Sequence, residues 1–215
     1  MPVVSEANLE FWGAGTPRTL RAIWTAEELG LDYVFHPIGP RTGETQTPEY
    51  TALTPKQKVP LMVEGDFCLT ESIAIARYLV DAHPNDAFWR PASARERARE
   101  DEWITFAFGE LDETALYVMR RHGDLGPIYG ASPAVVEASR AYAERMLAVV
   151  GRALESRRWL VGDGFGLADL IMVTCLDWAY AYEAAVPEAA RAWRGEIAKR
   201  DAYRRAQHIN AGKES

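Results

Sequence analysis

Residues 58–72 read KVPLMVEGDFCLTES and carry the clearest structural pattern of the chain. Two apolar runs, 60–63 and 67–69, flank Glu64-Gly65-Asp66, and this arrangement predicts a β-hairpin. Thr70 is a good helix N-cap, so we expect a helix from there to about Ala82, with its apolar residues on one face. The stretch is therefore expected to form a hairpin that is followed directly by a covering helix.

The residues before this hairpin predict further strands and a helix. Leu9–Trp12 is a strand candidate, Pro17–Leu29 has helical periodicity, and Asp32–His36 is β-like. A polar, turn-rich connection runs from Gly39 to Thr47. The order β-α-β, a connection, then β-β-α predicts a small α/β sandwich with four strands.

The chain changes character near residue 84. Residues 84–91 contain two prolines and read as a linker, and no convincing strand follows them. Helices are expected over 92–121, 132–156, 167–182, 187–199 and 201–206. The predicted division is an α/β domain over 1–83, the linker over 84–91 and an all-helical domain over 92–215.

Composition excludes several classes of protein. The 215 residues include 24 Lys and Arg against 31 Asp and Glu, which gives a net charge of −7. We therefore expect no nucleic-acid partner and no anionic membrane partner. The two cysteines, Cys68 and Cys175, are far apart and fit free thiols in a reducing cytosol. No apolar stretch approaches a membrane span and Met1–Glu10 does not resemble a signal peptide, so a cytoplasmic location is expected.

Three short segments could bind a ligand, and each also has a plain structural interpretation. Val59-Pro60 is either an ordinary trans proline that begins a strand, or a cis bond that leaves the Val59 backbone open to an added strand. Thr70-Glu71-Ser72 is either a simple helix cap, or a receptor for the carboxylate and ammonium groups of an amino acid. Thr16, after a glycine-containing loop, is either a helix cap or a hydroxyl that donates to a thiolate.

The three segments together resemble the glutathione S-transferase family. The similar motifs are Thr16-Pro17, LTPKQKVP at 53–60, TESIAIARYL at 70–79 and GDGFGLAD at 162–169. The run from Lys58 to Ser72 is most similar to the theta class and related bacterial enzymes. The resemblance implies an α+β, thioredoxin-like N-terminal domain that binds glutathione, an all-α C-terminal domain that lines an electrophile site, and a homodimer.

The resemblance also implies roles for five residues that bind glutathione. Val59 would pair with the cysteinyl backbone, with Pro60 in the cis form, and Lys58 would face the glycyl carboxylate. Glu71 and Ser72 would hold the ammonium and carboxylate groups of the γ-glutamyl residue. Glutathione would be the cosubstrate, and no metal is implied.

Thr16 occupies the place of the serine that activates the thiol in theta-like members. A free alkyl thiol has a pKa of about 8.5, and lowering it to about 6.5 stabilises the thiolate by about 2.7 kcal/mol relative to the thiol. A hydroxyl donor and a helix N-terminus are groups of the kind that can supply this stabilisation. Trp12 stands near the catalytic tyrosine of other members, and an indole cannot serve that role.

Several positions depart from the family pattern. Thr45 replaces a frequent glutathione-binding histidine, which removes one expected contact, and Gln57 replaces a frequent glycine. Thr54 replaces the usual asparagine. Gly166 replaces the usual Ser or Thr cap, although Asp169 can still reach back to backbone N–H groups, so we interpret Asp169 as a folding residue.

The electrophile pocket is expected against the long helix over 92–121. Phe106, Glu110 and Trp178 are candidates for its lining, and both aromatic residues fit a hydrophobic core equally well. The implied activity is conjugation of glutathione to small hydrophobic electrophiles in detoxification. A glutathione-dependent peroxidase or disulfide oxidoreductase, and a binding module without catalysis, are the alternatives. The four histidines show no metal-ligand spacing, so no metal site is expected.

Overall fold

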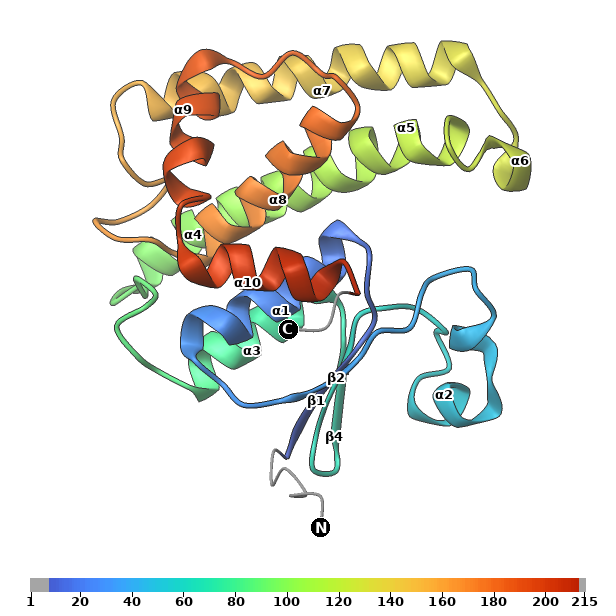
Figure 1. Cartoon of the computed structure of the whole chain (residues 1–215). Coiled ribbons are helices and arrows are strands. Elements are labelled where there is room, and N and C mark those ends of the chain that lie inside the picture. The colour runs from blue at the N-terminus through green and yellow to red at the C-terminus, as the bar shows by residue number, and fades with distance from the viewer. Residues whose placement is uncertain (1–7, 213–215) are drawn as a thin grey trace. The chain divides into compact units, whose positions relative to one another are not determined.

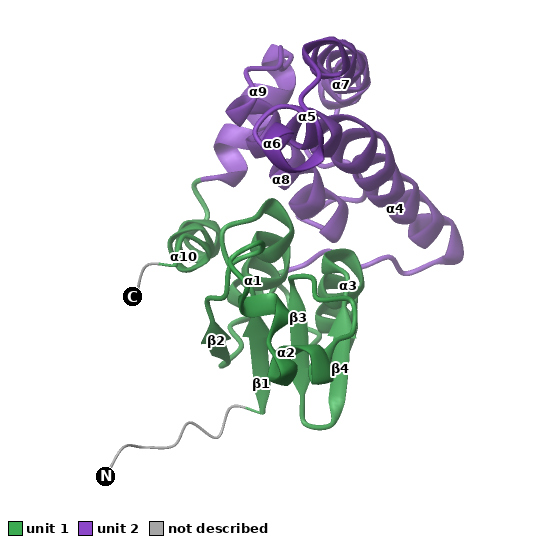
Figure 2. Ribbon diagram, turned by 90° about the vertical axis from the view of Figure 1, so that its right-hand side faces the viewer, with its two compact units in different colours: residues 1–87, 199–215 green, residues 88–198 purple. Residues whose placement is uncertain are grey.

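A computed structural model describes residues 8–212 of the chain. It divides into two compact units (Figure 2). Unit 1 contains the residues up to Ala87 and those from Lys199 onward, and unit 2 is Phe88–Ala198. The sequence predicts one helical domain over 92–215, and the structure differs at its end, because the residues from Lys199 onward belong to the unit that contains the sheet.

The sheet of unit 1 has four strands in the order β2-β1-β3-β4. They are β1 (Leu9–Trp12), β2 (Val34–His36), β3 (Leu61–Glu64) and β4 (Phe67–Thr70). Strands β1 and β2 are parallel, with Phe11 opposite Phe35, and the other two pairs are antiparallel. The predicted β-α-β unit and hairpin are confirmed, although β2 is two residues shorter at its start than the predicted strand over 32–36.

Two of the helices of unit 1 follow the predicted boundaries closely. Helix α1 (Pro17–Leu29) begins after the cap Thr16 and ends at Gly30, which has φ 67°. Helix α3 (Ser72–Ala82) begins two residues after Thr70. Leu9 and Phe11 of β1, Leu61 of β3 and the apolar faces of α1 and α3 supply the buried core of this unit. This is the α+β, thioredoxin-like arrangement that the resemblance implies.

Helix α2 (Pro48–Leu53) was not predicted and follows a short 3-10 turn over Glu44–Gln46. The Thr47 side chain accepts a hydrogen bond from the backbone N–H of Tyr50, and Pro48 stands at the first helical position. A cap followed by proline is the ordinary signal of a helix start. The helix is only six residues long, so its apolar periodicity is too short to identify it.

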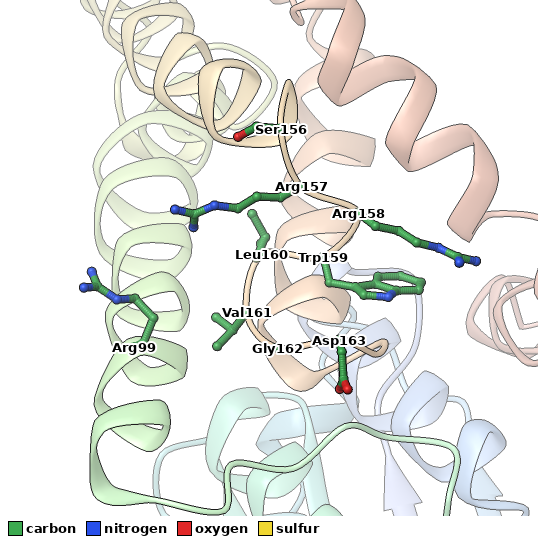
Figure 3. A pocket seen from close by; sticks show the side chains of 9 residues that line it. All are labelled: Arg99, Ser156, Arg157, Arg158, Trp159, Leu160, Val161, Gly162 and Asp163. Carbon is green, nitrogen blue, oxygen red and sulfur yellow. The ribbon is translucent and has the colours of Figure 1, made fainter.

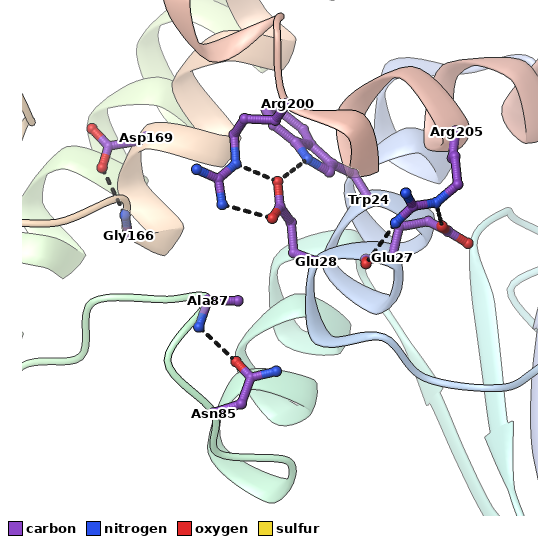
Figure 4. Close-up of polar contacts among 9 residues, drawn as sticks. All are labelled: Trp24, Glu27, Glu28, Asn85, Ala87, Gly166, Asp169, Arg200 and Arg205. Carbon is purple, nitrogen blue, oxygen red and sulfur yellow. Dashed lines mark hydrogen bonds and ion pairs between the residues drawn. The ribbon is translucent and has the colours of Figure 1, made fainter.

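Helix α10 (Asp201–Asn210) lies antiparallel along α1 within unit 1 (Figure 1). Near the end of α1, the guanidinium group of Arg200 donates to both carboxylate oxygens of Glu28, at 2.6 and 2.7 Å (Figure 4). The ring of Tyr203 meets Trp24 edge to face, with centroids 4.8 Å apart. These contacts join residues that are far apart in the sequence, so the helix could be predicted but not the unit to which it belongs.

Unit 2 is all-helical, as predicted. Its helices are α4 (Ala94–Phe106), α5 (Tyr117–His122), α6 (Gly126–Tyr129), α7 (Pro133–Leu154), α8 (Leu167–Ala181) and α9 (Glu188–Ile197), with a π-helical segment over Ala107–Leu116 between α4 and α5. Most of α8 is buried, which confirms it as the central helix of the bundle. Among residues 8–212, no helix is long and apolar enough to cross a membrane.

Asp169, at the start of α8, is a structural residue as predicted. Its carboxylate accepts a hydrogen bond from the backbone N–H group of Gly166 at 2.8 Å (Figure 4). It accepts another from the backbone N–H group of Leu160 at 2.9 Å. Only 1% of Asp169 is exposed. The carboxylate therefore fixes both the start of α8 and the loop before it.

Candidate functional site

The loop between β1 and α1 lies directly against Val59. Gly13 in this loop has φ 119°, and a Cβ atom at that position would stand 2.5 Å from the Val59 Cβ and 2.9 Å from the Thr19 Cγ2. The Val59–Pro60 peptide bond is cis, so the alternative of an ordinary trans proline is wrong. Two of the three predicted segments are thus in contact, and glycine permits the close approach.

The backbone of Val59 is open to a partner. Within residues 8–212, no hydrogen bond uses its N–H or C=O group. The residue precedes β3 and its side chain is half-buried. Unpaired N–H and C=O groups on one residue can pair with the backbone of a bound peptide, as in strand addition.

Tyr50 of α2 holds the segment that leads to Val59. Its hydroxyl donates to the carbonyl oxygen of Lys58 at 2.7 Å. The residue is 2% exposed, and this burial raises the pKa of its phenol to about 12. The unpredicted helix α2 therefore supplies a buried anchor for the backbone next to the site.

The start of α3 differs from the prediction in one respect. Thr70 is not the N-cap, because it pairs with Leu61 as the last residue of β4, and Glu71 occupies the cap position. Glu71 has φ 73°, and its side chain makes no capping hydrogen bond. A non-glycine residue with positive φ is strained, and such residues are concentrated at functional sites.

The exposed carboxylate of Glu71 is held by Lys56. The Lys56 Nζ atom lies 2.9 Å from Glu71 Oε1 and 2.8 Å from Thr70 Oγ1. The resemblance places Lys58 at the site, and its side chain is exposed. Sequence reasoning missed Lys56 because only the fold brings 56 next to 71.

Ser72 is 4% exposed, and its Oγ atom lies 3.5 Å from a guanidinium nitrogen of the buried Arg21 on α1. Because the Glu71 side chain makes no capping hydrogen bond, the first backbone N–H groups of α3 lack the kind of partner that Thr16 provides for α1. Uncapped N–H groups at a helix start can bind a carboxylate. This arrangement suits the predicted role of the Glu71-Ser72 segment.

Thr16 caps α1 through a reciprocal pair of hydrogen bonds. Its Oγ1 accepts from the backbone N–H of Thr19, and its own backbone N–H donates to Thr19 Oγ1, both at 3.0 Å. The side chain is half-buried. The capping role is therefore present, and the hydroxyl proton of Thr16 can still be donated to a second partner.

The departures from the family pattern have local explanations. Gln57, at the frequent glycine position, has φ 52°, and its side-chain amide donates to Thr51 Oγ1 at 3.0 Å. Thr45 and Thr54 are buried. Trp12 stacks on the ring of His36 with centroids 3.7 Å apart.

The three candidates for the electrophile pocket lie in unit 2. Phe106 is half-buried at the end of α4, and the Glu110 carboxylate accepts a hydrogen bond from Tyr142. Trp178 is 6% exposed on α8. None of the three lines the hollow described next, and their role at an electrophile site stays a prediction.

Unit 2 also contains an open hollow of about 610 Å³ between α4 and the segment after α7 (Figure 3). Its charged lining residues are Arg99, Arg157, Arg158 and Asp163. Arg99 forms an ion pair with Glu102 on the same helix, as expected of a solvated basic face. Arg157 and Arg158 extend in opposite directions, so they do not converge on one point (Figure 3).

Cys68 is exposed and Cys175 is buried, and the two cysteines do not form a disulfide bond, in agreement with the prediction. Among residues 8–212, no group of three or more His, Cys, Asp or Glu side chains is arranged to hold a metal ion.

Sequence models of two glutathione S-transferase domains match the chain. The N-terminal domain matches residues 7–81, and the C-terminal domain matches residues 109–201. With this fold and these segments, the chain belongs to the glutathione S-transferase family.

Individual relatives agree with this assignment. The chain is 29% identical to glutathione S-transferase 4 of Zea mays over 204 residues, which cover 92% of this chain and 91% of that protein. It is 34% identical to GstA of Escherichia coli O157:H7 over 134 residues, 62% of this chain and 63% of that protein. The theta class enzyme of Xanthomonas axonopodis pv. citri, solved with glutathione bound, superposes with a TM-score of 0.80 at 27% identity, covering 93% of this chain and 97% of that one.

Proposed function

We propose that the chain is a glutathione transferase that conjugates the thiolate of glutathione to small hydrophobic electrophiles. The observation that carries the proposal is the contact between the Thr16 loop and Val59, through Gly13. This contact sets the loop that leads to Thr16 against the residue whose backbone groups would pair with glutathione. A relative that shares the fold was solved with glutathione bound.

Glutathione would lie along Val59, with its backbone paired to the free N–H and C=O groups of that residue. Its γ-glutamyl carboxylate would bind at the uncapped start of α3, and its ammonium group would face Glu71. Lys58 would face the glycyl carboxylate. The sulfur would then be directed to the start of α1, where Thr16 donates its hydroxyl proton.

In the proposed reaction, the thiol loses its proton to solvent because the Thr16 hydroxyl and the positive end of α1 stabilise the thiolate. The sulfur forms a bond to an electrophilic carbon, and the leaving group departs with its bonding electron pair. Phe106, Glu110 and Trp178 are proposed to line the electrophile site. Each residue keeps the role that the resemblance gives it.

The test uses the purified full chain with glutathione and a chloronitrobenzene. We expect saturable binding of glutathione, turnover, and a kinetic pKa well below that of the free thiol. Thr16→Ala should raise this pKa, and Thr16→Ser, which keeps a hydroxyl, should leave it close to the wild-type value. An unchanged pKa in Thr16→Ala would remove Thr16 from the mechanism.

The same preparation distinguishes the alternatives. Binding of glutathione with turnover only of a peroxide or a disulfide would favour the peroxidase or oxidoreductase. A chain that does not bind immobilised glutathione would be a module without the ligand site. The homodimer, the cytoplasmic location and the role in detoxification stay predictions, and light scattering of the purified chain tests the first of them.

A further inference from the structure

Helix α10 ends at the loop that carries Thr16. Its last residue, Asn210, is 8% exposed and contacts three residues of this loop and of α1. The Asn210 carbonyl oxygen accepts from the backbone N–H of Gly15 at 2.7 Å, and its side-chain nitrogen donates to the Thr16 carbonyl oxygen at 3.2 Å. Its side-chain oxygen accepts from the Thr19 hydroxyl at 2.5 Å.

The orientation of the Asn210 amide follows from its partners. A carbonyl oxygen such as that of Thr16 can only accept, so the NH₂ group of Asn210 must face it. The amide oxygen then faces the Thr19 hydroxyl and has no hydrogen to donate. The single proton of the Thr19 hydroxyl therefore has two acceptors, the Asn210 amide oxygen at 2.5 Å and the Thr16 carbonyl oxygen at 2.8 Å, and the shorter contact is with Asn210.

This direction determines what Thr19 can do for Thr16. The two hydroxyl oxygens, Thr16 Oγ1 and Thr19 Oγ1, are 3.0 Å apart. With its proton directed to either of these two oxygens, Thr19 acts toward the Thr16 hydroxyl as an acceptor only. The Thr16 hydroxyl keeps its own proton, which can point to Thr19 or turn to a bound sulfur.

We infer that Asn210 is a positioning residue of the glutathione site, which orients the Thr16 hydroxyl through Thr19 and fixes the Gly15-Thr16 backbone. The inference rests on the proposed function, since it concerns the same hydroxyl. It adds a residue from the opposite end of the chain to the site, and none of the motifs at 16–17, 53–60 or 70–79 contains it.

Loss of Asn210 should release the Gly15-Thr16 backbone and leave the Thr19 hydroxyl with the Thr16 carbonyl oxygen as its acceptor, so the Thr16 hydroxyl would occupy several orientations. We expect Asn210→Ala to raise the kinetic pKa of bound glutathione by about 0.7. Below that pKa, kcat/KM should fall about five-fold. In a Thr16→Ala background, the same substitution should produce no further rise, because the two residues act as one unit.

Arg200→Met provides the matched control. It removes the ion pair with Glu28 at the other end of α10, far along the helix from Asn210. It should lower the melting temperature and leave the pKa unchanged. Two substitutions of Thr19 test the connection between Asn210 and Thr16 without altering α10. Thr19→Val should raise the kinetic pKa of bound glutathione, and Thr19→Ser, which keeps the hydroxyl, should not.

The outcomes separate the two ideas. A wild-type chain that neither binds glutathione nor lowers the pKa of its thiol contradicts the proposed function. If the wild type and Thr16→Ala behave as proposed, but folded Asn210→Ala and Thr19→Val keep the wild-type pKa, the role of Asn210 is overturned alone. Should Asn210→Ala fail to fold, the pair of Thr19 variants decides the question.

Discussion

The hydroxyl of Tyr50 donates a 2.7 Å hydrogen bond to the carbonyl oxygen of Lys58, one residue before Val59. A side chain from α2 thus holds the segment on which the proposed peptide partner would lie. Tyr50→Phe should destabilise the fold by about 1–2 kcal/mol, because the partly buried hydrogen bond to the Lys58 carbonyl oxygen is lost. It should also raise KM for glutathione more than it lowers kcat, which denaturant melts and steady-state kinetics would measure. A large fall in kcat with constant KM would contradict this positioning role.

The raised pKa of Tyr50 predicts a loss of stability at alkaline pH. The folded-state pKa is about 12, above the unfolded value near 10, so the folded state retains the phenolic proton longer. The contribution to stability is complete below about pH 10 and is lost as pH rises through about 12. The free energies of unfolding of the wild type and of Tyr50→Phe, measured by urea melts, should therefore become more similar as the pH rises from about 10 to about 12. A constant difference between them would argue against the shift.

Two glycines in one loop offer a matched comparison. A side chain at Gly13 would meet Val59 and Thr19, whereas at Gly15, which has φ 72°, nothing lies within 4 Å. Gly13→Ala should destabilise the protein by about 3 kcal/mol and abolish glutathione binding, because the loop and Val59 must separate. Gly15→Ala should cost about 1 kcal/mol from its backbone conformation. Thermal melts would compare the stabilities of the two variants, and calorimetric titration would compare their affinities for glutathione. Equal effects of the two substitutions would contradict the importance of the close approach between Gly13 and Val59.

Glu71 is expected to contribute binding energy and little stability. Its ion pair with Lys56 is exposed on both sides, and such pairs stabilise a fold by less than about 1 kcal/mol. Glu71→Gln should weaken glutathione binding at least about ten-fold, since it removes the partner of the γ-glutamyl ammonium. Glu49→Gln, an exposed carboxylate on α2, is the control for charge. Calorimetric titration would measure the affinity of each variant for glutathione. Equal affinities of Glu71→Gln and Glu49→Gln would show that Glu71 does not bind glutathione.

The start of α8 predicts opposite effects of two neighbouring substitutions. Asp169→Ala should cost about 2–4 kcal/mol, because two backbone N–H groups lose their acceptor. Gly166→Ser should stabilise by about 0.5–1 kcal/mol, since its φ of −123° suits any residue and the nearest atom would be 3.4 Å away. Neither should change the thiol pKa in the fraction that stays folded. Guanidinium melts measure both, and a destabilising Gly166→Ser would contradict the cap argument.

Much of the fold could be predicted, because its patterns are local. The hairpin, the caps Thr16 and Ser132 and the apolar face of α8 depend on neighbours within a few residues. The displaced start of α3 could not be predicted. Thr70 and Glu71 both precede a helical run, and only the pairing of Thr70 with Leu61 decides between them.

The site was predictable where a motif carried it and was missed where distant residues complete it. Thr16, Val59, Glu71 and Ser72 stand in short segments that resemble a family. Tyr50, Lys56 and Asn210 have ordinary surroundings in the sequence, and their contacts arise only after folding. A hydrogen bond between a side chain and the backbone of a distant residue produces no periodic pattern in the sequence.

The pairing of Thr16 with Asn210 has a consequence for the synthesis of the protein. The two residues are 194 positions apart, and the whole of unit 2 is translated between them. A ribosome that adds about 5–20 residues per second needs roughly 10–40 s to cover this interval. During that time the nascent chain carries α1 without α10, so the turn that contains Thr16 is completed only after Asn210 has been synthesised.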